Sequence, residues 1–323
     1  SGLIQHTYLV RLADGRRLVL QRMHPLFTPE VLIDIEAVTA HLEAQGLPTP
    51  RPLRTPAGAL CVTDADGHIW RVLTFLDGTT YDRVPSSKHA AEAGRLVATF
   101  HRALATLDHE LRFVRVGVHD TAAHLARLAD AAGQKRTSAD QRLTTLAEDI
   151  LSEAERLPPL GPLPQRLTHG DLKLSNVLFA CAPPVRAIAL IDLDTLGRQT
   201  LAYELGDALR SWCNPLGEDV EATRFDLDLF TAATTGYLAG ARELLTVEEI
   251  ASIVPGLATV CVELAARFCV DAFEDRYFGW DPARFPSRRE HNRVRATGQL
   301  SLACAVGAAR TAAEAIVFGA TRT

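Results

Sequence analysis

The segment His-Gly-Asp-Leu-Lys-Leu-Ser-Asn at residues 169–176 contains side chains that suit phosphoryl transfer. The carboxylate of Asp171 can accept a proton from a hydroxyl group, and Lys173 can neutralise a phosphate. The amide oxygen of Asn176 and the carboxylate of Asp192, sixteen residues further along, are the hard ligands that Mg²⁺ prefers. The order predicts Asp171 and Lys173 as catalytic residues and Asn176 and Asp192 as metal ligands.

The chain between the two metal ligands predicts a hairpin that would bring them together. Residues 177–180 and 187–191 are short apolar runs, separated by Pro183-Pro184. If the chain folds back at the prolines, Asn176 begins one strand and Asp192 follows the end of the other. A rigid hairpin would then hold both ligands at one edge.

Composition sets wide limits on what surrounds these residues. The chain has 323 residues, of which 47% are hydrophobic and 23% charged, with a net charge of −5. Nothing in this balance favours a nucleic-acid or membrane partner, and no run of eighteen apolar residues predicts a membrane span. Six cysteines without a Cys-x-x-Cys pair indicate reduced core thiols in a cytoplasmic protein. The oligomeric state is not indicated.

Several other nucleotide-binding or catalytic motifs are absent. The only lysines are Lys88, Lys135 and Lys173, and none follows a glycine, so there is no P-loop. The chain also lacks Gly-x-Gly and Gly-x-Ser-x-Gly, which argues against a dinucleotide fingerprint and a nucleophile elbow.

The pattern of apolar residues predicts an α+β fold with two parts. In the first part, residues 1–77, strands are expected at 7–10, 17–21, 60–63 and 70–76, with one helix at 28–46. Asp77-Gly78 is expected to be the hinge into residues 78–323. Helices are expected there at 90–107, 122–132, 140–157, 226–240, 248–273 and 290–318.

The motifs together resemble the aminoglycoside phosphotransferase and choline kinase superfamily, over nearly the whole chain. The helix with Glu36 that ends in Gly46-Leu47-Pro48, and the hinge-like Phe75-Leu76-Asp77-Gly78, carry the resemblance beside the catalytic segment. It implies a bilobal protein-kinase-like fold, a nucleotide-binding lobe at 1–77, a catalytic and acceptor lobe at 78–323, and ATP with Mg²⁺.

The same resemblance implies the nucleotide-binding residues. Phe75 and Leu76 would contact the nucleotide at the hinge. No lysine precedes Lys88, so Gln21 or Arg22 would stand where protein kinases have a strand lysine. Arg22 would then pair with Glu36 and hold the donor phosphates, because arginine suits two-point contacts with carboxylates and phosphates.

A closer resemblance is to the N-acetylhexosamine 1-kinases, which phosphorylate the anomeric hydroxyl of an amino sugar. It rests on Val-Leu-Gln-Arg at 19–22, His-Asp-Thr at 119–121, Ile-Asp-Leu-Asp-Thr at 191–195, Gly-Asp-Ala-Leu-Arg at 206–210 and the helical pattern from 263 to 299. It implies a sugar acceptor, carbohydrate metabolism and substrate contacts from Asp171, Asp194, Arg267 and Tyr277.

The sequence departs from these families at two places. Their glycine-rich loop should precede the first hairpin, but only Gly2 of it is present, so we expect the first lobe to be truncated at its start. Gln5 stands where the sugar kinases usually show Asn. The loop at 274–278 is one residue shorter than theirs.

Two polar stripes have alternative interpretations. Glu263, Arg267 and Asp271 share one helical face, and Asn292, Arg295 and Gln299 share another. They could be solvated faces or could line the acceptor cleft. We expect His169 to support the catalytic loop, His101 to pack within a helix, and Asp207 to cap a helix or brace the loop.

Two other functions stay open. An aminoglycoside, choline or other alcohol could be the acceptor. Ten acids and ten arginines from residue 241 onward give a polycation no excess of negative charge to bind, and 6% aromatic residues make an aromatic box for choline harder to build. A catalytically silent nucleotide-binding scaffold is the alternative of another class.

Overall fold

The computed structural model describes residues 6–134 and 141–320, so the expectations for Gly2 and Gln5 lie outside the described residues. The strands are β1 (His6–Arg11), β2 (Arg17–Arg22), β3 (Val62–Thr63), β4 (Ile69–Thr74), β5 (Arg166–Thr168), β6 (Val177–Phe179), β7 (Ala187–Leu190) and β8 (Gly197–Gln199). The helices are α1 (Glu30–Ala44), α2 (Ser87–Leu104), α3 (Thr121–Gly133), α4 (Gln141–Ala154), α5 (Leu201–Trp212), α6 (Leu227–Ala241), α7 (Val247–Ala251), α8 (Ile253–Glu274), α9 (Arg288–Ala308) and α10 (Arg310–Ala320). Two single turns of 3₁₀ helix, η2 (Leu174–Asn176) and η3 (Leu193–Thr195), follow the catalytic loop and β7.

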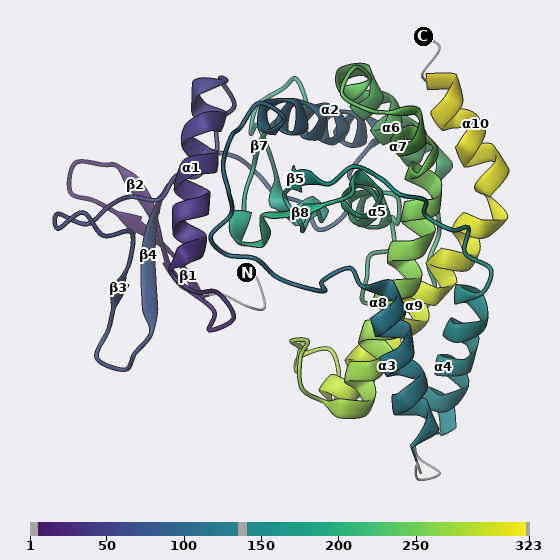
Figure 1. Ribbon diagram of the computed structural model, residues 1–323. Coiled ribbons are helices and arrows are strands. Elements are labelled where there is room, and N and C mark those ends of the chain that lie inside the picture. Colours follow the sequence, from purple (N-terminus) through teal and green to yellow (C-terminus); the bar gives the residue numbers. More distant parts are fainter. Residues whose placement is uncertain (1–5, 135–140, 321–323) are drawn as a thin grey trace.

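The strands form one larger sheet and two short ladders. The first four strands pair antiparallel in the order β1-β2-β4-β3, and β5 pairs with β8 and β6 with β7. Figure 1 shows the four-stranded sheet at one end of the molecule, with α1 between it and the helical remainder. This arrangement confirms the expected α+β class with a small β-rich part and a large helical part.

Helix α1 is attached to the helical part through a buried carboxylate. Asp34 is only 1% exposed. Its oxygens accept hydrogen bonds from the His109 ring (2.8 Å) and from the backbone nitrogens of Arg112 (2.8 Å) and Phe113 (2.9 Å). A buried carboxylate with several donors is favourable only while all of them stay in place. Asp34 therefore fixes how α1 sits against the segment that follows α2.

Helix α8 is the central helix of the larger part and packs along α5 and α9, while α2 packs along α6. By length and hydropathy α8 could cross a membrane, and so could α9 and α10 if their bent pair were one span; these are the only candidates in the described residues. However, 83% of the apolar window of α8 is buried inside the fold. Its apolar character is accounted for by packing.

Three helical expectations differ from the structure. The region 248–273 is broken at Ser252 into α7 and α8, and the region 290–318 is bent by 67° between α9 and α10. Helix α5 was not expected as a helix. Asp207 lies within α5 and not at its cap, and its oxygen accepts a 2.7 Å hydrogen bond from Arg210 one turn later.

After β4 the chain crosses to the catalytic part and pairs briefly with β6. The nitrogen of Thr79 lies 2.8 Å from the oxygen of Phe179, and the reverse hydrogen bond is 2.9 Å. The division of the chain at 77/78 stays a prediction. All six cysteines are free, but only Cys213, Cys261 and Cys269 are buried, so the expectation of core thiols holds for half of them.

Candidate active site

The catalytic segment forms a tight loop between β5 and β6 that brings three of the predicted side chains together. The Lys173 ammonium donates to Asp171 Oδ2 at 2.5 Å. The Asn176 amide nitrogen donates to the Asp171 backbone oxygen at 2.8 Å and to its carboxylate at 3.1 Å. Because the nitrogen of Asn176 faces Asp171, its amide oxygen faces away and is the atom that a metal ion could use.

Lys173 keeps its positive charge in this setting. Burial lowers the pKa of its ammonium, but the carboxylates of Asp171, Asp192 and Asp207 together raise it above its ordinary value. A permanently charged ammonium beside Asp171 can stabilise negative charge on a phosphoryl group.

The predicted hairpin is present and holds Asn176 near Asp192. Val177 on β6 pairs with Leu190 on β7, and the nitrogen of Ile191 donates to the backbone oxygen of Asn176 at 3.0 Å. Asp192 follows directly, in the left-handed conformation (φ 67°, ψ 58°) that aspartate and asparagine adopt more readily than most residues. Asp192 is an exposed residue just beyond the strand end, and neighbouring groups crowd its carboxylate.

The donor set around Asp192 suits a divalent cation. Desolvation and the neighbouring carboxylates of Asp194 and Asp171 raise the pKa of Asp192, against the opposing effects of Lys173 and Arg71. A hard cation would relieve this crowding of negative groups, and one carboxylate with one amide oxygen leaves positions for water and phosphate. The residues present therefore fit Mg²⁺.

Side chains of helix α5 hold the catalytic loop in place through hydrogen bonds to its backbone. Glu204, 1% exposed, accepts the backbone N–H groups of His169 (2.8 Å) and Gly170 (2.9 Å). Trp212 donates its indole N–H to the oxygen of Leu172 (2.9 Å), and the Ser211 hydroxyl accepts the N–H of Leu174 (3.0 Å). The loop is thus fixed by α5 on both sides of Asp171, although the sequence analysis did not predict this helix.

His169 and His101 have the supporting positions that were expected. The His169 ring lies 3.0 Å from the Ile191 oxygen, which ties the catalytic loop to the end of β7. His101 on α2 is buried between Glu204 (3.2 Å) and the Tyr237 hydroxyl (2.9 Å).

The expected pair between Arg22 and Glu36 is not formed. Glu36 pairs instead with Arg54, whose Nε and Nη2 donate to the two carboxylate oxygens at 2.7 and 2.5 Å. Gln21 lies opposite Arg71 in the sheet. Arg54 lies in the extended segment after α1, which folds back against Glu36. The spacing of apolar residues does not predict this contact.

The half-buried Phe75 and Leu76 follow the end of β4, and the guanidinium of Arg17 lies 4.4 Å from the Phe75 ring centroid. Their expected contact with a nucleotide stays a prediction.

The largest difference from the sequence analysis concerns Asp194, which was expected to face the substrate. Its side chain is buried and forms a two-point ion pair with Arg71 of β4, including a 2.9 Å hydrogen bond from Nη2. Arg71 itself is 2% exposed and was not singled out. An arginine among the apolar residues of Ile69–Thr74 could have indicated a buried cation, although not its partner.

Most residues of the polar stripes on α8 and α9 are buried, and one hydrogen bond joins the two stripes while the others lead to different parts of the chain. Asp271 accepts hydrogen bonds from the backbone of residues 276–278 and from the Asn292 amide (2.7 Å). Glu263 is fully buried and bonds His119 (2.9 Å) and Thr121 (2.7 Å). The solvated alternative is therefore wrong for most of these residues, because they are buried and paired.

Two residues with expected substrate contacts lie in the second half of α8 and in the loop that follows it. Arg267 is 3.7 Å from Glu263 and its guanidinium lies over the Phe278 ring, 5.7 Å from its centroid. Tyr277 is 57% exposed in the loop that Asp271 holds. Their role toward an acceptor stays a prediction.

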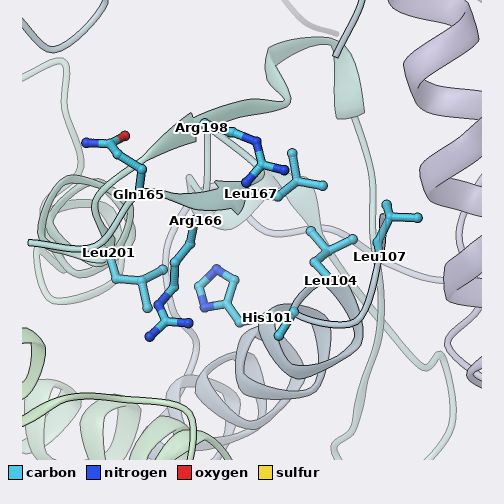
Figure 2. Close-up of a pocket in the computed structure, with 9 residues that line it drawn as sticks. His101, Leu104, Leu107, Gln165, Arg166, Leu167, Arg198 and Leu201 are labelled. Carbon is cyan, nitrogen blue, oxygen red and sulfur yellow. The ribbon is translucent and has the colours of Figure 1, made fainter. Parts of the chain in front are cut away.

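A pocket of about 140 Å³ lies behind the catalytic loop and is separate from these residues. Figure 2 shows His101, Arg166 and Arg198 on its walls, together with leucines from α2, β5 and α5. None of the predicted catalytic or metal-binding residues lines it. The site around Asp171 is therefore built on loop and strand ends, outside this pocket.

Known proteins resemble this chain over much of its length. The sequence model of the phosphotransferase enzyme family matches residues 1–243. Two curated relatives are homoserine kinases. The protein of Methylobacterium nodulans is 32% identical over 54% of this chain and 50% of its own length. That of Allorhizobium ampelinum is 30% identical over 73% and 66%, respectively. The chain thus spans about half the length of the first relatives that it matches.

Solved structures share the fold over nearly the whole chain. An aminoglycoside phosphotransferase of Alicyclobacillus acidocaldarius superposes with a TM-score of 0.63 at 18% identity, covering 97% of this chain and 94% of that one. A microcompartment-associated aminopropanol kinase superposes with a TM-score of 0.56 at 18% identity, covering 98% and 94%. At such identities the likeness establishes the bilobal protein-kinase-like fold.

Proposed function

The chain belongs to the phosphotransferase enzyme family, and from this premise we propose that it transfers the terminal phosphoryl group of ATP to a hydroxyl group of a small molecule. The observation that carries the proposal is the cluster in which Lys173 and Asn176 both donate to the Asp171 carboxylate, at 2.5 and 3.1 Å, beside the turn that presents Asp192.

Each residue of the cluster has a distinct task in this proposal. Asp171 orients the acceptor hydroxyl and takes its proton, since an alcohol is a poor nucleophile until its proton has an acceptor. Lys173 stabilises charge on the moving phosphoryl group. Most of the catalysis then comes from positioning and fixed charge, as is general for phosphoryl transfer.

The donor is expected to bind between the sheet and the catalytic loop. Asn176 and Asp192 would hold Mg²⁺, which would neutralise the donor phosphates when bound. Residues 1–77 would form the nucleotide-binding lobe, with Gln21, Arg22, Phe75 and Leu76 near the nucleotide. Glu36 would fix the middle of α1 to the following segment through its pair with Arg54, and it would not orient a phosphate-binding arginine.

Two acceptor classes have specific support. The Asp-Leu-Asp-Thr segment at 192–195 and Arg267 favour the anomeric hydroxyl of an N-acetylhexosamine, by resemblance. The curated relatives favour homoserine or another amino alcohol. The relatives give the sugar acceptor no support, and they make amino-acid metabolism an alternative to carbohydrate metabolism.

Charge near the site suits a neutral or zwitterionic acceptor better than a polycation. Arg267 is matched by Glu263, and Arg210 by Asp207 and Glu218. A polycationic antibiotic requires uncompensated carboxylates. An aminoglycoside acceptor is therefore disfavoured.

The test is an ATP-consumption screen with Mg²⁺ over N-acetylglucosamine, N-acetylgalactosamine, homoserine, choline, ethanolamine and an aminoglycoside. Phosphorus NMR of the product separates a glycosyl 1-phosphate from the phosphate ester of a primary alcohol. Turnover with any of these acceptors supports the proposal and names the acceptor class, and turnover with the aminoglycoside alone would overturn the two favoured classes. Nucleotide binding without turnover on any acceptor would instead support a silent scaffold.

A further inference from the structure

Arg71 and Gln21 face each other across two neighbouring strands of the sheet. They are direct partners in the antiparallel register of β2 and β4, so their side chains share one face. Arg71 donates its Nε to the Gln21 side-chain oxygen at 3.0 Å. Gln21 occupies the strand where a lysine would be expected, and it orients an arginine on the adjacent strand.

The guanidinium of Arg71 reaches across to the turn that follows the metal-binding strand. Its two terminal nitrogens contact the two oxygens of Asp194, 123 residues away in sequence, and the two side chains are 1% and 2% exposed. Asp194 lies in η3, which begins immediately after Asp192. This ion pair therefore ties the sheet to the turn that aims the Asp192 carboxylate.

Charge gives the pair a second effect on Asp192. An unpaired carboxylate at Asp194 would place a buried negative charge two residues from the predicted metal ligand. Arg71 lies against that charge and counteracts part of its effect on Asp192. A planar guanidinium that binds both oxygens also fixes the carboxylate in orientation, which an ammonium cannot do.

We propose that Arg71 is a positioning residue of the active site: acting through Asp194, it holds η3 so that Asp192 faces the metal ion and the donor phosphates. This role rests on the proposed function and concerns the same site. It assigns a residue that neither the motifs nor the relatives indicated. The cation that the small β-rich part brings to the active site would thus be Arg71 on β4, and not a lysine on β2.

The experiment measures metal binding without turnover. Mn²⁺ is titrated into the protein with the non-hydrolysable nucleotide AMP-PNP and followed by electron paramagnetic resonance. The test variant is Arg71→Met with Asp194→Leu, because apolar residues of similar size often replace a buried ion pair without loss of fold. Arg51→Met is the matched control, since it removes an exposed arginine–carboxylate pair with Glu43 in the same part of the chain.

The double variant should keep a cooperative thermal transition and lose affinity for Mn²⁺ by about 10-fold or more, in the range seen when groups that orient metal ligands are removed. Arg51→Met should bind as the wild type does. Wild-type affinity in a folded double variant would show that the pair only stabilises the fold.

Should the double variant fail to fold, Arg71→Lys decides. Lysine keeps the charge but loses the two-point contact, so a measurable weakening of Mn²⁺ binding is expected, and wild-type affinity would overturn the role. If the wild-type protein itself binds no Mn²⁺ with AMP-PNP, the proposed function fails instead, and the two failures are thereby distinguished.

Discussion

The Glu204 carboxylate lies 2.9 Å from the backbone nitrogen of Gly170 and so fixes the residue immediately before Asp171. The same carboxylate holds His169 and is itself in contact with His101. A buried acid that satisfies successive backbone donors acts as an internal support for the catalytic loop. The position of Asp171 therefore depends on a side chain that never touches substrate.

Glu204→Gln should destabilise the protein by about 1–3 kcal/mol, because the amide turns a donor toward a buried N–H and leaves it unsatisfied. Urea unfolding at pH 7 measures the loss, and kcat should fall with it. Unchanged stability would contradict the support role.

The effect of Glu204 should also depend on pH. Burial raises its pKa, but His101 and the hydrogen bonds outweigh burial and leave the pKa below its usual 4.5. A lowered pKa in the folded state means that ionised Glu204 stabilises the fold above about pH 4.5, and that this is lost as the pH falls through the folded value. The stability gap between wild type and Glu204→Gln should therefore be constant above pH 5 and narrow below 4.5.

Asp171→Asn should lower kcat by about 10²-fold or more, the range expected for loss of a general base. Asparagine keeps the size and can still accept a hydrogen bond from Lys173, so nucleotide affinity should change little. Calorimetry with ATP beside steady-state kinetics checks both. A kcat within a few-fold of wild type would remove Asp171 from the role of base, and a collapse of ATP binding would make its role structural.

Asp192→Asn should nearly abolish turnover and raise the Mg²⁺ concentration needed for half-maximal rate, without unfolding. Asparagine tolerates the left-handed backbone of Asp192, so the change removes charge and leaves the turn intact. Asp275→Asn is the matched control, because Asp275 has the same backbone conformation (φ 55°) away from the catalytic loop. It should leave the Mg²⁺ dependence unchanged, and wild-type turnover in Asp192→Asn would exclude Asp192 as a ligand.

Gly170→Ala should be more destabilising than Gly67→Ala. Both glycines have positive φ (78° and 83°), but a Cβ at Gly170 would lie 2.2 Å from the Thr195 oxygen, whereas nothing lies within 4 Å at Gly67. The conformational cost of about 1–2 kcal/mol is shared, and crowding adds about 1–3 kcal/mol at Gly170 alone. Thermal unfolding of the two variants gives the comparison. Equal losses of stability would show that the backbone at Thr195 moves to make room for the added Cβ.

The sequence predicted what depends on residues close together in the chain. Asp171, Lys173 and Asn176 lie in one loop, and their mutual contacts follow from spacings of two to five residues. The β6–β7 hairpin was likewise readable, since two apolar runs around Pro183-Pro184 have few ways to pair. Most helices of the larger part were placed by their apolar period for the same reason.

The tertiary structure decided which charged groups meet. Glu36 could have paired with any nearby arginine, and packing of the segment after α1 selected Arg54 over Arg22. Arg71 and Asp194 are 123 residues apart, and no local pattern relates a strand arginine to a turn aspartate at that distance. Glu263 and Asn292 could have lain on solvated faces or lined the acceptor cleft, but both are fully buried and form hydrogen bonds to side chains on other elements. Sequence polarity records that a side chain needs a polar partner, and only the packed fold determines whether that partner is water, a substrate or another residue.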